Sequence, residues 1–112
     1  MTFVSRGIHL TMSIIHETEY FSGLVEELHD LKVKMRILAR VNRARTGNFG
    51  EYKVLGDGIC EMKIDYSPGY HAYYTQEGLN MYLLILGGDK SSQNKDIAKA
   101  KEIWRTIMEE RQ

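Results

Sequence analysis

The sequence predicts an α+β fold in which a small twisted antiparallel sheet packs against helices. Two observations support this class. Residues 58–88 contain three strand-like runs separated by two turn signals, and segments with a helical apolar period lie on both sides of them. A chain of 112 residues is the size of one domain. We assign that domain to residues 13–112 and treat residues 1–12, which show no clear period, as an N-terminal extension in which Met12 is an alternative start.

The strands are predicted from alternation and turn chemistry. Residues 59–65 alternate apolar with polar side chains, and Ser67-Pro68-Gly69 then supplies a turn. Residues 70–76 are rich in tyrosine, which favours strands, and Glu77-Gly78 turns the chain again. Residues 81–86 form a continuous apolar run expected for a buried central strand. A short run at residues 13–16 is expected to add an edge strand.

Two helices are predicted before this meander. Thr18 is a suitable N-cap for an amphipathic helix that extends to Leu28. The second helix spans residues 31–45 and stops at Gly47. Its expected apolar face consists of Leu31, Met35, Leu38, Val41 and Ala44, and its expected basic ridge of Lys32, Arg36, Arg40 and Arg43.

The remaining segments complete the predicted order β-α-α-β-β-β-α. Residues 49–57 are expected to form a loop, and residues 87–92 a polar turn. Ser92 or Asn94 would cap a last helix. Its apolar face would contain Ile97, Ala100, Ile103, Trp104, Ile107 and Met108. Trp104 lies on this stripe, which favours a role in the core over a role in stacking on a base.

Composition excludes several classes of protein. The chain has no apolar run long enough to span a bilayer, and Cys60 is its only cysteine, so it has neither an internal disulfide nor a cysteine metal site. These features favour a cytoplasmic location. The formal net charge is zero, but residues 31–53 carry seven basic side chains against one acidic side chain. Such a clustered basic patch can bind polyanions on a neutral protein.

Familiar catalytic motifs are absent, and the polar face of the predicted sheet is the best candidate site. The chain contains no HExxH, P-loop or GxSxG motif. The polar residues on or beside the sheet are Lys53, Lys63, Asp65, His71, Tyr73, Tyr74 and Lys90. Lysines can stabilise the charge of a phosphoryl transition state, histidine can transfer protons near neutral pH, and tyrosine can stack on a base. The alternative is a solvated face with cross-strand ion pairs.

Several motifs in order resemble the HigB-like addiction module killer protein group of the RelE/ParE toxin superfamily. They are the run from Ala44 to Gly58 (ARTGNFGEYKVLGDG), the run from Glu61 to Tyr66 (EMKIDY), Pro68-Gly69-Tyr70, Tyr73-Tyr74, and the run from Leu86 to Gln93 (LGGDKSSQ). The similarity covers roughly residues 14–108. It implies a compact RelE-like α/β fold and a bacterial or phage-derived type II toxin that is neutralised by a small helix-turn-helix (HigA-like) antitoxin.

The resemblance also implies an activity and roles for individual residues. RelE and HigB toxins are ribosome-dependent endoribonucleases that cut mRNA, with the RNA 2′-hydroxyl as nucleophile and without a metal or other cofactor. By position, Lys63 would contact RNA or assist proton transfer, and Lys90 would bind the scissile phosphate. His71 occupies the position of the arginine that stabilises the transition state. Lys53 would be a second phosphate contact. Tyr73, Tyr74 and the ridge Lys32, Arg36, Arg40 and Arg43 are further expected RNA-binding residues.

Two departures from the family pattern leave alternatives open. His71 cannot make the bidentate, permanently charged contact of an arginine, and zero net charge is low for a protein that docks on ribosomal RNA. One alternative is therefore a catalytically weakened member that acts as an antitoxin-binding partner or corepressor. Another is a toxin of the ParE branch, which targets gyrase.

Overall fold

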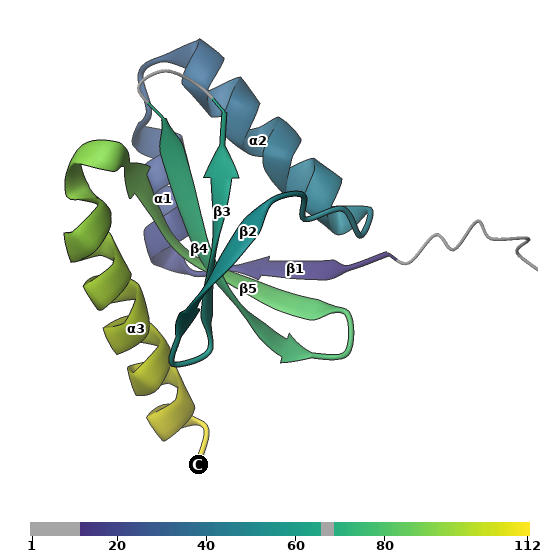
Figure 1. Ribbon diagram of the computed structural model, residues 1–112, viewed down its shortest axis with the longest axis vertical. Coiled ribbons are helices and arrows are strands. Elements are labelled where there is room, and N and C mark those ends of the chain that lie inside the picture. Colours follow the sequence, from purple (N-terminus) through teal and green to yellow (C-terminus); the bar gives the residue numbers. More distant parts are fainter. Residues whose placement is uncertain (1–11, 66–68) are drawn as a thin grey trace, which may run out of the picture.

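The computed structural model describes residues 12–65 and 69–112, and these form a five-stranded sheet with three helices (Figure 1). The sheet order is β1-β5-β4-β3-β2; β1 pairs parallel with β5, and every other pairing is antiparallel. The elements are β1 Ile14–Glu17, α1 Glu19–Glu27, α2 Leu31–Arg45, β2 Tyr52–Gly56, β3 Ile59–Ile64, β4 Tyr70–Gly78, β5 Met81–Asp89, a 3-10 turn Lys90–Ser92 and α3 Gln93–Glu110. This arrangement confirms the α+β class. Residues 1–11 of the extension expected at 1–12, and the first two residues of the turn expected at 67–69, lie outside the described residues.

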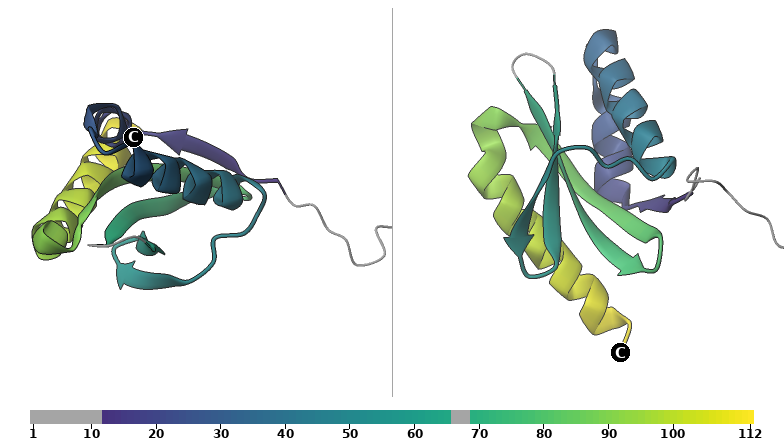
Figure 2. Two further views of the ribbon diagram at one scale, coloured as in Figure 1. Left: turned by 90° about the horizontal axis from the view of Figure 1, so that it is seen from above. Right: turned by 45° about the vertical axis from the view of Figure 1, so that its right-hand side comes forward.

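Helices cover both faces of the sheet. Phe21 and Val25 of α1 and Val33 and Ile37 of α2 pack in one apolar cluster with residues of β3, β4 and β5. Ala100 and Ile103 of α3 pack in a second cluster, with Ile59, Tyr73, Leu83, Ile85 and Leu86 of the sheet. The two clusters lie on opposite faces because successive side chains of a strand alternate. Figure 2 shows α1 and α2 together on one side of the sheet and α3 on the other.

The expected loop at residues 49–57 is instead largely strand β2, so the predicted order lacked one strand. Asp57 and Gly58 have φ of 54° and 80°, as in the two-residue turn that joins antiparallel strands. The Asp-Gly pair was therefore a hairpin signal. The strand itself was obscured because β2 is an exposed edge strand without an apolar alternation, and Tyr52 and Val54 point to solvent.

The expected polar turn at residues 87–92 begins later than predicted, because Gly87–Asp89 continue β5. At Gly87, a Cβ atom would lie 3.0 Å from Leu24 Cδ2 and 3.2 Å from the carbonyl oxygen of His71, so α1 and β4 approach this backbone closely. The chain then turns at Lys90–Ser92, where the Asp89 carboxylate accepts hydrogen bonds from the Ser91 amide at 2.9 Å and the Ser91 hydroxyl at 2.5 Å.

The bounds predicted for α2 are confirmed, and so is the burial of Val41 and Ala44, but the other three residues of its predicted apolar face are exposed. Leu31, Met35 and Leu38 are 68%, 59% and 46% exposed. The buried side of the helix consists of Val33, Ile37, Arg40, Val41 and Ala44. An arginine therefore occupies a core-facing position. Because the predicted face was drawn from apolar residues alone, it lay partly on a different side of the helix from the buried face. Thr18 caps α1 as predicted, accepting a hydrogen bond from the Phe21 amide at 3.2 Å.

Candidate functional site

Four of the residues predicted to contact RNA line one hollow on the sheet. Lys53 comes from β2, Lys63 from β3, His71 from β4 and Lys90 from the turn after β5. The strand register explains this, since Lys63 pairs with His71, and Lys53 pairs with Glu61, two residues before Lys63 on the same strand. The full lining, called here the lysine hollow, is Glu51, Tyr52, Lys53, Glu61, Lys63, Asp65, Gly69, His71, Lys90 and Gln93.

Beneath these cations lies a buried carboxylate that the sequence analysis did not single out. Glu61 is 4% exposed, and its Oε2 lies 3.5 Å from His71 Nδ1, an ion-pair distance when the imidazole is protonated. The same Oε2 accepts a hydrogen bond from Gln93 Nε2 at 2.8 Å, at the start of α3. The His71 side chain is 11% exposed, so one edge of its ring faces this carboxylate while the residue still lines the hollow. The structure therefore places an imidazole and a buried carboxylate side by side in the wall of the hollow, although Nδ1 forms no hydrogen bond among the described residues.

The three lysines of the hollow lie near its surface. Lys63 keeps 60% of its side chain exposed, and its Nζ lies 3.9 Å from Asp65 Oδ1, a carboxylate that is itself 92% exposed. Exposed pairs at this distance are weak, so a phosphate can compete with Asp65 for the ammonium group. Lys53 and Lys90 are exposed. Hydrogen bonds from Ser91 lower the pKa of Asp89, which keeps this carboxylate ionised and holds the turn that presents Lys90.

Tyr73 and Tyr74 were expected to stack on RNA, and their burial contradicts that expectation. Tyr73 is fully buried in the cluster under α3, and Tyr74 is 4% exposed and stacks on Phe49 with ring centroids 5.1 Å apart. Burial, followed by the negative charge of Glu61, raises the pKa of the Tyr73 phenol. The accessible aromatic ring at the hollow is instead Tyr52, which is 57% exposed on edge strand β2.

The predicted basic ridge of α2 contains two kinds of residue. Lys32, Arg36 and Arg43 are exposed, whereas Arg40 is only 7% exposed. Arg40 Nε donates to the carbonyl oxygen of Lys63 at 3.2 Å, and its Nη2 donates to the carbonyl oxygen of Phe49. Arg40 is therefore not an exposed member of the ridge as expected, because its Nε and Nη2 join α2 to β3 and to the segment before β2.

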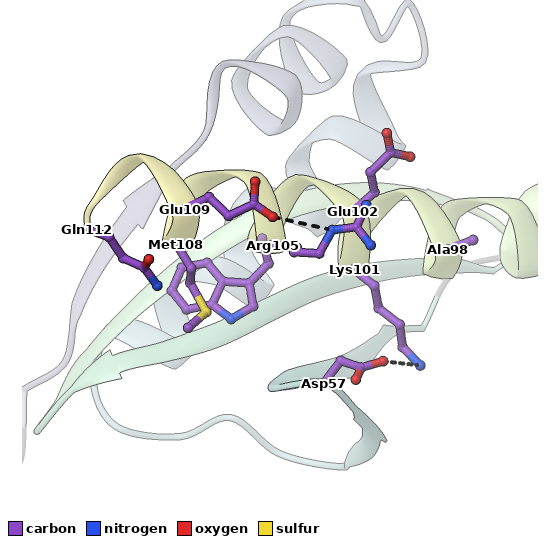
Figure 3. Close-up of a pocket in the computed structure, with 9 residues that line it drawn as sticks. Asp57, Ala98, Lys101, Glu102, Arg105, Met108, Glu109 and Gln112 are labelled. Carbon is purple, nitrogen blue, oxygen red and sulfur yellow. Dashed lines mark ion pairs between the residues drawn. The ribbon is translucent and has the colours of Figure 1, made fainter.

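A second hollow runs along α3 and suits an anion poorly (Figure 3). Both cations of its lining, Lys101 and Arg105, already have carboxylate partners. Lys101 Nζ lies 3.5 Å from Asp57 Oδ2, and Arg105 Nε lies 3.9 Å from Glu109 Oε1. The other lining residues include Met108, Gln112 and Trp104, whose ring packs beside the second apolar cluster as the sequence predicted. None of the predicted RNA-binding residues lines this groove.

Within residues 12–65 and 69–112, no group of three or more His, Cys, Asp or Glu side chains is arranged to hold a metal ion. In the same part of the chain, every helix is too short or too polar to cross a membrane.

Comparison with known proteins found one relative of high similarity. No family model matches the chain. An uncharacterised protein of Haemophilus influenzae (strain ATCC 51907 / DSM 11121 / KW20 / Rd) is 41% identical over 87 residues, a match that covers 78% of this chain and 88% of the relative. Identity at this level over most of both chains indicates common descent and a shared fold. The chain therefore belongs to the same family as this uncharacterised H. influenzae protein.

Proposed function

We propose that the chain is a metal-independent endoribonuclease of the RelE/HigB type, the toxin of a type II toxin-antitoxin pair that inhibits translation by cutting mRNA on the ribosome. The observation that carries the proposal is the lysine hollow. The sequence predicts Lys53, Lys63, His71 and Lys90 as RNA contacts, and these residues line one concavity although they come from four separate segments. A helix-turn-helix antitoxin of the HigA type is the proposed partner.

The proposed reaction is an internal transesterification. The RNA 2′-oxygen attacks the adjacent phosphorus, the bond from phosphorus to the 5′-oxygen breaks, and a 2′,3′-cyclic phosphate and a 5′-hydroxyl end result. His71 accepts the proton of the 2′-hydroxyl as general base, and the departing 5′-oxygen takes a proton from the ammonium group of Lys63. Lys90 and Lys53 bind the phosphate oxygens and stabilise the extra negative charge of the transition state.

Glu61 is placed to support proton transfer by a histidine at this position. A carboxylate 3.5 Å from Nδ1 is placed to stabilise the imidazolium that forms when His71 accepts a proton. Gln93 in turn holds the carboxylate through its 2.8 Å hydrogen bond. Proton transfer by His71 would thus replace the charge stabilisation that the related toxins obtain from an arginine.

Induced expression in a bacterial host tests the proposal. The wild-type chain should arrest growth and produce new mRNA 5′-hydroxyl ends, while His71→Ala and Lys90→Ala should relieve both effects. Arg105→Ala, an exposed change on α3 outside the lysine hollow, is the matched control and should remain toxic. Robust growth of cells that accumulate the folded wild-type chain without an antitoxin would contradict the proposal. Arrest without new mRNA ends would point to the ParE branch.

The proximity of Glu61 to His71 also favours a second candidate, a non-catalytic member that acts as antitoxin partner or corepressor. A buried carboxylate beside His71 offsets positive charge where the related toxins carry an arginine. In that case the wild-type chain is harmless, and His71→Arg restores toxicity. Under the ribonuclease proposal His71→Arg gives no gain, because the arginine cannot accept the proton.

A further inference from the structure

We infer that the hollow between α2 and β3 is a second phosphate subsite, which binds the RNA backbone beside the scissile phosphate. This inference rests on the proposed function. The hollow, called here the arginine hollow, is lined by Arg36, Ala39, Arg40, Arg43, Lys63, Ile64 and Asp65. Four of these seven residues are cationic and one is acidic, which gives the strongest local excess of positive charge among the hollows described above.

Two guanidinium groups from its lining, those of Arg40 and Arg43, come close together beside Gly50. A Cβ atom placed on Gly50 would lie 2.9 Å from Arg40 Nη2 and 3.3 Å from Arg43 Nη2, so both nitrogens approach one point. Among residues 12–65 and 69–112, neither Arg40 nor Arg43 forms an ion pair with a carboxylate. Like charges held this close repel each other, and a bound anion would relieve the repulsion.

A second observation, independent of the charge of the hollow, also points to a ligand: one nitrogen of Arg40 is buried without a partner in the part of the chain that the structure describes. Arg40 Nη1 is buried and has no hydrogen-bond partner among the described residues, although Nε and Nη2 are both used. Buried donors in native proteins nearly always have an acceptor, so an unpartnered guanidinium nitrogen at the wall of a cationic hollow calls for one. Burial, and then the charge of Arg43, lowers the pKa of Arg40, as expected for a cation that lacks its counter-ion.

The position of the arginine hollow favours RNA backbone over an acidic protein segment. Lys63 lines both this hollow and the lysine hollow, so the two sites are continuous across one side chain. A chain of phosphates that crosses Lys63 can place one phosphate near His71 and a neighbouring phosphate beside Arg43. Guanidinium groups match phosphate oxygens in a forked geometry, which lysine cannot provide.

The test is the salt dependence of binding to a short single-stranded RNA with 2′-O-methyl sugars, which cannot be cleaved. Fluorescence anisotropy of the labelled oligonucleotide, titrated with the intact protein at several salt concentrations, gives Kd and its salt slope. Arg43→Gln should weaken binding about three- to tenfold at low salt and reduce the slope of log K against log salt by about 0.7 to 1. Arg43→Lys should keep most of the slope, and Arg105→Gln on α3 should match the wild type.

The outcomes separate this inference from the proposed function. If Arg43→Gln binds with the wild-type Kd and slope while His71→Ala abolishes mRNA cleavage in cells, the subsite is wrong and the ribonuclease stands. If the slope falls as expected but cells show no cleavage, the subsite stands without the enzyme. Failure of the wild-type protein to bind the oligonucleotide even at low salt would overturn the subsite. So would an Arg43→Gln variant that binds RNA normally but no longer copurifies with its antitoxin.

Discussion

Arg40→Met should destabilise the fold by about 2–4 kcal/mol, although the other members of the predicted basic ridge are exposed. Methionine keeps the apolar stem of the side chain but removes the donors that satisfy the carbonyl oxygens of Lys63 and Phe49. Each buried carbonyl left without a partner costs about 1–3 kcal/mol. Two such carbonyls would cost about 2–6 kcal/mol, and relief of the repulsion between Arg40 and Arg43 offsets part of this cost, which lowers the expected range to about 2–4 kcal/mol.

Urea unfolding followed by circular dichroism measures this change directly. In thermal unfolding of a domain of this size, the same loss of 2–4 kcal/mol should lower Tm by about 8–16 °C. Arg43→Met is the matched control, because this exposed arginine lies three residues further along the same helix, and its stability should stay within about 0.5 kcal/mol of the wild type. Equal stabilities for Arg40→Met and the wild type would refute the assignment of Arg40 as a structural link between α2 and β3.

Three further changes test separate parts of the structure. Gly58→Ala should destabilise the β2–β3 hairpin by about 1–2 kcal/mol in thermal unfolding, since φ is 80° there and a Cβ would lie 3.2 Å from Trp104 Nε1; an unchanged Tm would contradict the turn geometry. Burial alone would raise the pKa of Glu77, but hydrogen bonds from Arg111 and His16 lower it overall, so its contribution to stability is present at neutral pH and is lost as pH falls below about 4.5. Arg111→Ala should therefore lower stability at pH 7 and flatten the loss of stability between pH 5 and 3, and an unchanged pH profile would count against this pair. Glu61→Gln should keep the fold but slow RNA cleavage about 10- to 100-fold with little change in RNA affinity, because the imidazolium of His71 loses its counter-charge; a variant with wild-type cleavage would remove Glu61 from the mechanism.

The sequence predicted the architecture well where side-chain patterns reflect burial. The bounds of α2, the Thr18 cap and the apolar strand that became β5 all follow from local periodicity and capping chemistry. Strand β2 was missed because an exposed edge strand has little apolar alternation, although Asp57-Gly58 marked the hairpin. Gly87 and Gly88 were taken for a turn because nothing local indicates that another element packs closely against their backbone.

The candidate site was predicted in part. Lys53, Lys63, His71 and Lys90 do lie together. They could be predicted because their residue types and the family resemblance both indicated the polar side of the strands. The burial of Tyr73 and Tyr74 could not be predicted from their strand propensity, since either face of β4 is covered by helices. The burial of Arg40 and Glu61 was not predicted, because a charged side chain in a sequence is taken for a surface residue until its buried partner is known.

Sequencing of cellular mRNA 5′ ends after brief induction tests the central claim most directly. The comparison is between the wild-type chain and His71→Ala, both shown to be folded and equally abundant. The ribonuclease proposal predicts new 5′-hydroxyl ends within coding sequences for the wild type and their loss in His71→Ala. New ends that persist in His71→Ala, or no new ends from a folded wild-type chain, would contradict a catalytic role for the lysine hollow.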